Sequence, residues 1–180
     1  EDIELVPVNM ITGEQRSPEF RKKNPQGMLP VLELDDGRCF SESLAIIEYL
    51  EELRPEPPMI GTTAEERLHV RRLERICEMG VLHGVGQAVQ NSHIFFAKRV
   101  DQSESGVAQG KKRANAALRT LDGEIGDNAF VCGDRVTIAD CTLSASLWFA
   151  HVMGVKLDVA EWPNVARWNA SFRKRASANA

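Results

Sequence analysis

The spacing of hydrophobic residues changes character near residue 60. Before that point, short apolar segments are separated by turns that contain glycine or proline, a pattern typical of strands and short helices. Beyond it, apolar residues recur every three or four positions over long stretches, which indicates amphipathic helices. The sequence therefore predicts a small α/β unit followed by an all-helical unit.

The first part is expected to contain three strands. Residues 3–8 place apolar side chains at positions 3, 6 and 8, which we interpret as a strand. Residues 29–34 and 38–40 are interpreted as two further strands. Asp35-Asp36-Gly37 lies between them and predicts a hairpin turn, because glycine accepts the positive φ of a tight turn.

Two helices are expected in the same part. Ser17-Pro18 is typical of a helix start, since serine offers a capping oxygen and proline is tolerated at the first helical position. Asn24-Pro25-Gln26-Gly27 then ends this short helix. A second helix is predicted over residues 41–53, where the proline-rich sequence that follows cannot continue it. We expect a first domain at residues 1–53, a linker at 54–62 and a helical domain at 63–180.

The helical domain is expected to contain four main helices. Capping-box sequences open two of them, at Thr63 with Glu66 and at Thr137 with Asp140. The segment that follows Thr137 is nearly all apolar, so this helix should be buried, with Trp148 in the core. The predicted helices cover residues 63–92, 105–125 and 138–152, and a last one that begins at Pro163.

Composition narrows the class of protein. The chain has 180 residues, of which 43% are hydrophobic and 27% charged, with a net charge of −4. These values are ordinary for a globular protein and argue against a nucleic-acid partner. No apolar run reaches the ~20 residues of a membrane-spanning helix. The four cysteines form no CxxC pair and the histidines lack metal-ligand spacing, so we expect reduced thiols, a cytoplasmic location and no metal site.

Three short motifs resemble those of the cytosolic glutathione transferases, in a broad bacterial theta- or phi-like form. Residues 24–32 read NPQGMLPVL, similar to the family pattern N-P-x-G-x-[VLI]-P-x-L. Residues 41–46 read SESLAI, similar to the [ED]-S-x-A-I sequence that opens a helix. Residues 133–140 read GDRVTIAD, similar to the family's G-x-x-x-[ST]-x-A-D. The resemblance implies a thioredoxin-like first domain, incomplete at its start, and an all-α helical-bundle second domain.

The resemblance also implies a glutathione site in the first domain. The Leu29–Pro30 bond would be cis, and the main chain of Leu29 would pair with the cysteinyl backbone of glutathione as a strand would. The alternative is that Pro30 merely begins a strand. Met28 stands where the family often has Gln, Asn or Lys, and it cannot donate the extra hydrogen bond.

Two neighbouring residues would bind the γ-glutamyl end of glutathione. The hydroxyl and amide of Ser43 would bind its carboxylate at a helix N-terminus, and Glu42 would pair with its ammonium group. The alternative is an ordinary helix start, with Ser41 or Ser43 as the cap and Glu42 favouring the helix dipole.

A third contact is implied at Gln15. It matches a position where the family often has a histidine that meets the glycyl carboxylate, and glutamine can donate the same hydrogen bond. Two alternatives stay open: Gln15 is a solvated loop residue, or Arg16 binds the glycyl carboxylate in its place. The family's catalytic Ser, Cys or Tyr lies just after the first strand. This sequence begins without methionine at what resembles the second strand, so we expect the catalytic residue upstream and assign none.

The implied activity is a glutathione transferase of the detoxification type. It would bind an apolar electrophile between the domains, with Phe95 and Phe96 either in that pocket or in the core, and would act as a homodimer. Two alternatives stay open: a non-catalytic binding or regulatory protein with the same fold, and a glutathione-dependent reductase, isomerase or dehalogenase. Thr137 and Asp140 match a folding element of the family and receive no catalytic role.

Overall fold

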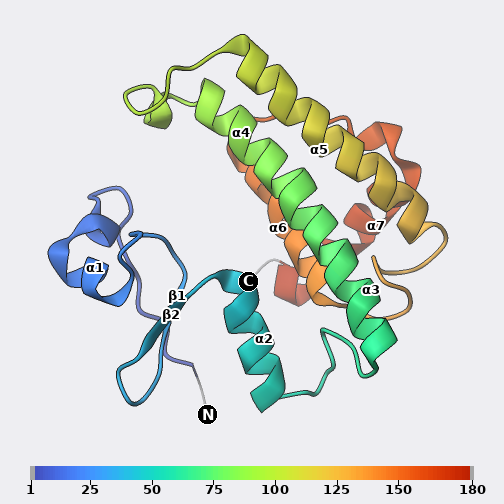
Figure 1. Ribbon diagram of the computed structural model, residues 1–180. Coiled ribbons are helices and arrows are strands. Elements are labelled where there is room, and N and C mark those ends of the chain that lie inside the picture. Colours follow the sequence, from blue (N-terminus) through green and yellow to red (C-terminus); the bar gives the residue numbers. More distant parts are fainter. Residues whose placement is uncertain (1–2, 179–180) are drawn as a thin grey trace. The chain divides into compact units, whose positions relative to one another are not determined.

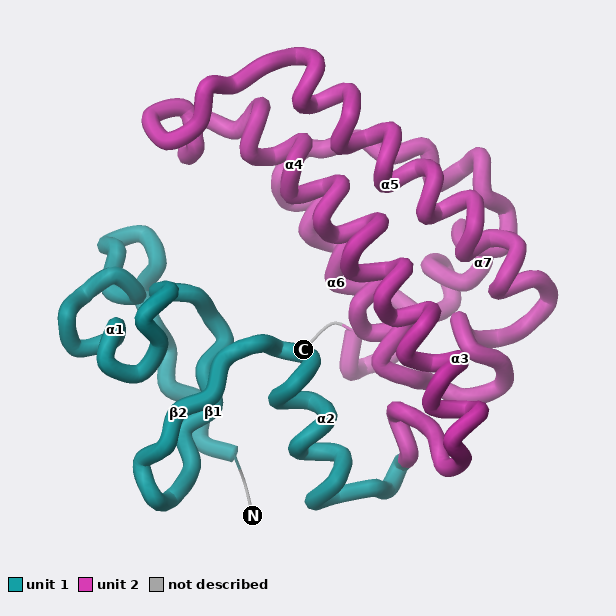
Figure 2. The backbone as a smooth tube through the Cα atoms, viewed as in Figure 1, with its two compact units in different colours: residues 1–57 teal, residues 58–180 magenta. Residues whose placement is uncertain are grey.

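A computed structural model describes residues 3–178, and the chain forms two compact units, Glu1–Pro57 and Pro58–Ala180 (Figure 2). Each unit has its own secondary structure, which Figure 1 labels. The first contains a hairpin and short helices, and the second is built from helices. The narrower division into a domain at 1–53, a linker at 54–62 and a domain at 63–180 stays a prediction.

The first unit is organised around a two-stranded antiparallel hairpin. Its register pairs Val31 with Ser41 and Glu33 with Cys39. The turn is closed by a hydrogen bond from the Leu34 amide to the Arg38 carbonyl at 2.9 Å, and Gly37 has φ 82°, as the turn sequence predicts. In chain order, the elements are the 3₁₀ helix η1 (Glu14–Arg16), α1 (Pro18–Lys23), β1 (Val31–Glu33), β2 (Cys39–Ser41) and α2 (Ser43–Leu53).

The start of α1 confirms the capping prediction. The Ser17 hydroxyl accepts a hydrogen bond from the Phe20 amide at 3.1 Å, and Pro18 occupies the first helical position. Ser17 thus satisfies one of the free amides of the first turn, and Pro18 has no amide hydrogen that would need a partner.

The strand predicted over residues 3–8 is wrong. In the described part of the chain this segment pairs with no strand and has no regular structure, and the Leu5 side chain is 88% exposed. Spacing of apolar residues cannot make a strand without a neighbour to complete its hydrogen bonds. Pro7 also lacks an amide hydrogen, which disfavours pairing within a sheet.

The second unit is a bundle of helices around one apolar core. Long side chains from several helices are fully buried there, among them Leu73, Leu118, Leu143 and Trp168. None of the described helices combines the length and the apolar character needed to cross a membrane. In chain order, the elements are α3 (Ala64–Arg75), the π-helical segment η2 (Ile76–Leu82), α4 (His83–Ser92), η3 (Ile94–Phe96), α5 (Glu104–Ile125), α6 (Ile138–Val152), η4 (Val159–Glu161), α7 (Pro163–Phe172) and η5 (Ala176–Ala178).

The helix predicted over residues 63–92 is present but is not uniform. α3 runs into seven π-helical residues before α4 continues the same helical path. Gly80 lies within this wider stretch, and a Cβ atom there would stand 2.4 Å from the Cβ of Ala117 on α5. The π-helical stretch therefore lies against its neighbour too closely for a side chain. Hydrophobic spacing carries no signal for such a change in helical pitch.

α4 and α5 lie side by side (Figure 1) and pack closely through glycine. A Cβ atom on Gly84 would stand 2.7 Å from the carbonyl oxygen of Gly110, and one on Gly110 would stand 2.5 Å from that of Gly84. The two glycines therefore allow the helix backbones to approach without a layer of side chains between them.

The start of α6 is built on a buried carboxylate. Thr137 and Asp140 form the predicted capping box. Asp140 is fully buried and accepts hydrogen bonds from the amides of Val131 and Thr137, both at 2.9 Å, and from Trp168 Nε1 at 2.8 Å. A single side chain thus joins the loop before α6, the cap of α6 and the last long helix.

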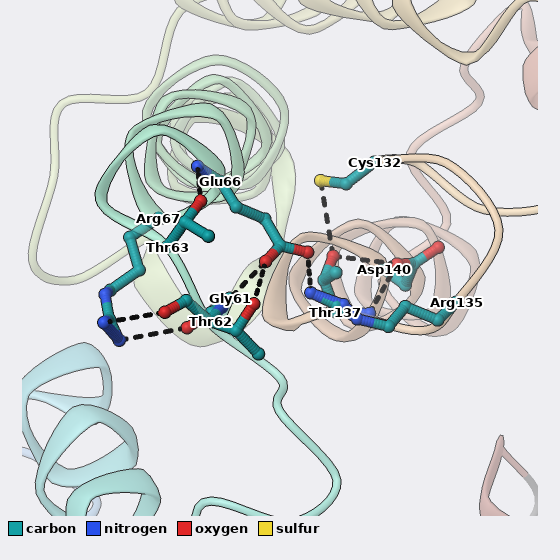
Figure 3. Close-up of polar contacts among 9 residues, drawn as sticks. All are labelled: Gly61, Thr62, Thr63, Glu66, Arg67, Cys132, Arg135, Thr137 and Asp140. Carbon is teal, nitrogen blue, oxygen red and sulfur yellow. Dashed lines mark hydrogen bonds and ion pairs between the residues drawn. The ribbon is translucent and has the colours of Figure 1, made fainter.

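The start of α3 is tied to the same region, but not through the capping box predicted at Thr63. The Thr63 hydroxyl caps the helix by accepting from the Glu66 amide at 3.1 Å. The Glu66 carboxylate instead accepts from the amide and hydroxyl of Thr62, at 2.7 and 2.9 Å, and also pairs with Arg135 (Figure 3). The second half of the capping box is therefore displaced by one residue, and it leaves Glu66 free to bridge to the loop before α6.

The prediction that Trp148 lies in the core is wrong. It is 62% exposed, although the neighbouring Leu147 and Ala150 are buried. α6 buries one face, and Trp148 lies on the other face together with the exposed Val152. An apolar sequence all along a helix does not by itself show that every face is covered.

Candidate functional site

The open end of the hairpin brings two of the predicted site segments together. Val31 pairs with Ser41 at the last position of the ladder, so Leu29-Pro30 and Glu42-Ser43 flank the same end of the hairpin. The first pair lies directly before β1, and the second lies where β2 passes into α2. Residues that are twelve or more positions apart in the sequence therefore meet at one edge of the first unit.

The main chain at Leu29 is available for a partner. The Leu29–Pro30 bond is cis, as the resemblance implies. Neither the amide nor the carbonyl of Leu29 makes a hydrogen bond within residues 3–178, and the residue is partly exposed. Backbone groups that stay unpaired next to a strand can accept an extended peptide.

Asn24 supports this segment and was not predicted as a functional residue. It is buried, donates from Nδ2 to the Met28 carbonyl at 2.9 Å, and accepts at Oδ1 from the Gln26 amide at 3.1 Å. These bonds fix the loop immediately before Leu29. The signal in the sequence was the asparagine of the NPQG turn, which we interpreted as a helix stop and as the start of a family motif without assigning Asn24 a role of its own.

Gln15 lies against the same loop. It is only 8% exposed, so its alternative interpretation as a solvated loop residue is wrong. A Cβ atom on Gly27 would stand 2.8 Å from the Gln15 carbonyl oxygen, which shows how closely η1 approaches this turn. Gln15 Oε1 is buried and has no hydrogen-bond partner in the described part of the chain. Oε1 is an acceptor, so it suits an N–H donor of a ligand, whereas only Nε2 of the same carboxamide could donate to a carboxylate.

Glu42 has an unusual backbone. Its φ is 75° and its ψ is 106°, a region that residues other than glycine rarely adopt. Such a conformation costs about 1–3 kcal/mol and is typical of functional sites. It places Glu42 as the residue that precedes the first turn of α2.

The N-terminus of α2 is not capped by a side chain. Neither Ser41 nor Ser43 serves as its cap: Ser41 ends β2, Ser43 is the first helical residue, and Glu42 makes no capping hydrogen bond. Capping by Ser41 or Ser43 is therefore wrong, while a favourable effect of Glu42 on the helix dipole stays a prediction. The amides at this helix start remain directed toward any anion that binds there. In other helices, side chains accept hydrogen bonds from the first-turn amides. The acceptors are Ser17 for α1, Thr63 for α3, Ser103 for α5 and, from α5, Asp122 for α7.

These features define a site for an extended peptide-like molecule with charged ends. The Leu29 main chain suits a peptide backbone, the start of α2 suits a carboxylate, and the Glu42 carboxylate suits an ammonium group. The Met28 side chain is exposed and offers no hydrogen-bond donor.

The second unit offers no reactive thiolate. Burial raises the pKa of the Cys132 thiol to about 11 and raises that of Cys77, and partial desolvation raises that of Cys141, a residue at the surface. A thiol in this state stays protonated and is a poor nucleophile. Among residues 3–178, His, Cys, Asp and Glu side chains form no group of three that could hold a metal ion.

Comparison with known proteins identifies the family. Residues 2–58 match the N-terminal domain of glutathione S-transferases, and residues 104–169 match the C-terminal domain. The chain is 34% identical to the maleylacetoacetate isomerase of Pseudomonas aeruginosa over 170 aligned residues. The alignment covers 92% of this chain and 77% of that protein. This chain belongs to the glutathione S-transferase family. Its fold class is therefore the predicted one, a thioredoxin-like unit followed by a helical domain.

Two further relatives show the range of names in the family. The chain is 31% identical to glutathione S-transferase 2 of Saccharomyces cerevisiae, over 97% of this chain and 76% of that protein. A glutathione S-transferase from Methylobacillus flagellatus KT, solved with glutathione bound, has a TM-score of 0.83 at 26% identity, over 99% of this chain and 85% of that chain.

Proposed function

We propose that the first unit binds glutathione through Gln15, Leu29, Pro30, Glu42 and Ser43. The observation that carries the proposal is the hairpin register, which brings the unpaired Leu29 main chain and the uncapped start of α2 to the same end of the hairpin. Family membership and the glutathione-bound relative from Methylobacillus flagellatus KT support the same ligand.

Each end of glutathione would have its own partner. The cysteinyl backbone pairs with the amide and carbonyl of Leu29, next to the cis-proline. The γ-glutamyl carboxylate binds the Ser43 hydroxyl and the free amides at the start of α2, and the γ-glutamyl ammonium pairs with Glu42. The Nε2 group of Gln15 donates a hydrogen bond to the glycyl carboxylate.

The proposed reaction is addition of the glutathione thiolate to an apolar electrophile. A free thiol with a pKa near 8.5 is mostly protonated at pH 7, and only the thiolate is strongly nucleophilic. The enzyme would therefore act by stabilising the thiolate and by holding it near the electrophile. In conjugation, a carbon–sulfur bond forms, and either a leaving group departs or the adduct takes up one proton.

A second candidate is a glutathione-dependent isomerisation, favoured by the name of the Pseudomonas aeruginosa relative. Thiolate addition to a conjugated double bond leaves a single bond that can rotate. Loss of the same thiolate then restores the double bond in the other geometry. Glutathione is regenerated, so the two candidates differ in their stoichiometry.

That difference gives a direct test of the reaction class. The protein would be incubated with glutathione and either an aryl halide or a cis-configured unsaturated diketo acid, while free thiol and product are measured. Loss of one thiol for each product molecule supports conjugation, and product formation at constant free thiol supports isomerisation. No turnover of either substrate by protein that binds glutathione would leave the non-catalytic alternative.

The binding site is tested by calorimetric titration of glutathione. We expect Glu42→Gln to weaken binding by about five- to tenfold, because it removes the charge opposite the ammonium but keeps the length of the side chain. Ser43→Ala should weaken binding by about tenfold through loss of a hydrogen bond to a carboxylate.

The matched control for this titration is Glu52→Gln, which removes one exposed charge from the other end of α2. It should leave the affinity within about twofold of the unchanged protein, because exposed charges more than a Debye length apart are screened. An equal loss of affinity in Glu42→Gln and Glu52→Gln would show that only net charge matters and would contradict the proposed contact.

We also propose that the protein is a homodimer in the cytoplasm. Sedimentation velocity would test its mass.

A further inference from the structure

The second unit buries a carboxyl group that the proposed function does not use. Glu74, near the end of α3, is only 3% exposed. Its Oε1 accepts from the Thr142 hydroxyl on α6 at a long 3.4 Å, and its Oε2 has no hydrogen-bond partner within residues 3–178. An ionised carboxylate accepts several hydrogen bonds and is costly to bury without them. As an anion, Glu74 would be poorly satisfied in this position.

The groups around Glu74 also disfavour a negative charge. Glu78 lies four residues further along the same helical path, in η2, where side chains one turn apart are neighbours on the helix surface, and its negative charge opposes ionisation of Glu74. Arg75 is the cation nearby, and it is engaged in an ion pair with Glu78. Two neutral groups also lie close to Glu74: the Thr142 hydroxyl from α6 and the buried thiol of Cys77 from η2.

A proton on Glu74 would both give its Oε2 a hydrogen bond and remove the repulsion from Glu78. A protonated carboxyl group gains an O–H donor, and the Glu78 carboxylate, one helical turn away, offers an acceptor. We propose that Glu74 is protonated in the folded protein and donates a hydrogen bond from Oε2 to Glu78, so that the contact between α3, η2 and α6 is a pH-sensitive element that weakens as the pH rises. Loss of the proton would leave two adjacent carboxylates, one of them buried.

The electrostatic surroundings agree with this geometry. Burial is the main factor that raises the pKa of Glu74 above its ordinary value of 4.5, and the neighbouring Glu78 raises it further, while Arg75 and the Thr142 hydroxyl oppose this rise without reversing it. A group with a raised folded pKa contributes stability that is fully present below the unfolded pKa. That contribution is lost as the pH rises through the folded pKa. The second unit should therefore lose stability on the alkaline side of pH 4.5.

The inference is tested by comparing Glu74→Gln with the unchanged protein in urea unfolding experiments between pH 4 and 9. Glutamine keeps the shape and supplies a donor to Glu78, so it imitates the protonated state at every pH. Near pH 4 the two proteins should be similarly stable. As the pH rises between the unfolded and folded pKa values, the ratio of their unfolding constants should change by about tenfold for each pH unit, in favour of Glu74→Gln.

Two further measurements make the outcome decisive. Glu65→Gln, an exposed change on the same helix, should keep the pH dependence of the unchanged protein. Infrared difference spectra of the unchanged protein should show a protonated carboxyl band that disappears as the pH rises, and Glu74→Gln should lack this band. A ratio of unfolding constants that stays constant from pH 4 to 9, or a protonated carboxyl band that is the same in the unchanged protein and in Glu74→Gln, would overturn the proposal.

Discussion

Replacing Asp140 with alanine should lower the free energy of unfolding by about 3–5 kcal/mol, since several buried donors lose their acceptor at once. The Val131 amide, the Thr137 amide and Trp168 Nε1 all donate to this one carboxylate, at 2.8–2.9 Å. Each donor left unpaired in the interior costs about 1–3 kcal/mol. The loss is large because Asp140 connects three separate parts of the second unit.

Urea denaturation followed by circular dichroism would measure this change. Asp134→Ala is the matched control, because Asp134 lies in the loop before the same helix and is exposed. It should change the free energy of unfolding by less than about 0.5 kcal/mol. A loss below about 1 kcal/mol in Asp140→Ala would show that water replaces the carboxylate easily, contrary to its complete burial.

Gly110→Ala should destabilise the protein by about 3 kcal/mol, because it adds a methyl group where two helix backbones touch. The new Cβ would stand 2.5 Å from the Gly84 carbonyl oxygen and 2.7 Å from the Ala88 amide nitrogen. Both neighbours are backbone atoms, so α4 and α5 must move apart to admit it. The movement would also disturb the core residues that these helices share.

The control for this prediction lies on the same helix. Gly123 has nothing within 4 Å of its ideal Cβ position, so Gly123→Ala should raise the free energy of unfolding by about 0.5–1 kcal/mol through helix propensity. Opposite signs for the two alanine variants would confirm that packing, and not propensity, decides the outcome at Gly110. A gain of stability in both would show that the helices adjust without cost.

Local signals in the sequence predicted most of the elements. Ser17-Pro18 sets the start of α1, Asp35-Asp36-Gly37 sets the hairpin turn, and Thr137 with Asp140 sets the start of α6. In each case neighbouring residues supply both the backbone conformation and the hydrogen-bond partner. The physics that fixes these positions is contained within four or five residues, so it is visible in the sequence.

Features that depend on distant contacts could not be predicted in this way. Residues 3–8 lack the pairing that would make them a strand, and Trp148 lies on a face that nothing in the second unit covers. For the candidate site, the motifs indicated Leu29, Glu42 and Ser43 separately. Their meeting depends on the hairpin register, and the burial of Gln15 depends on its packing against the loop at Gly27.

The hydrogen bond from Trp168 to Asp140 gives the protein a spectroscopic reporter. All three tryptophans (Trp148, Trp162 and Trp168) lie in the second unit. The first unit contains no tryptophan and one tyrosine, Tyr49. Trp168 is 1% exposed and Trp148 is 62% exposed, so a shift of tryptophan emission to longer wavelength follows the loss of the environment around Trp168. Fluorescence excited at the tryptophan band therefore follows the opening of the α6 cap directly, while unfolding confined to the hairpin unit leaves it unchanged.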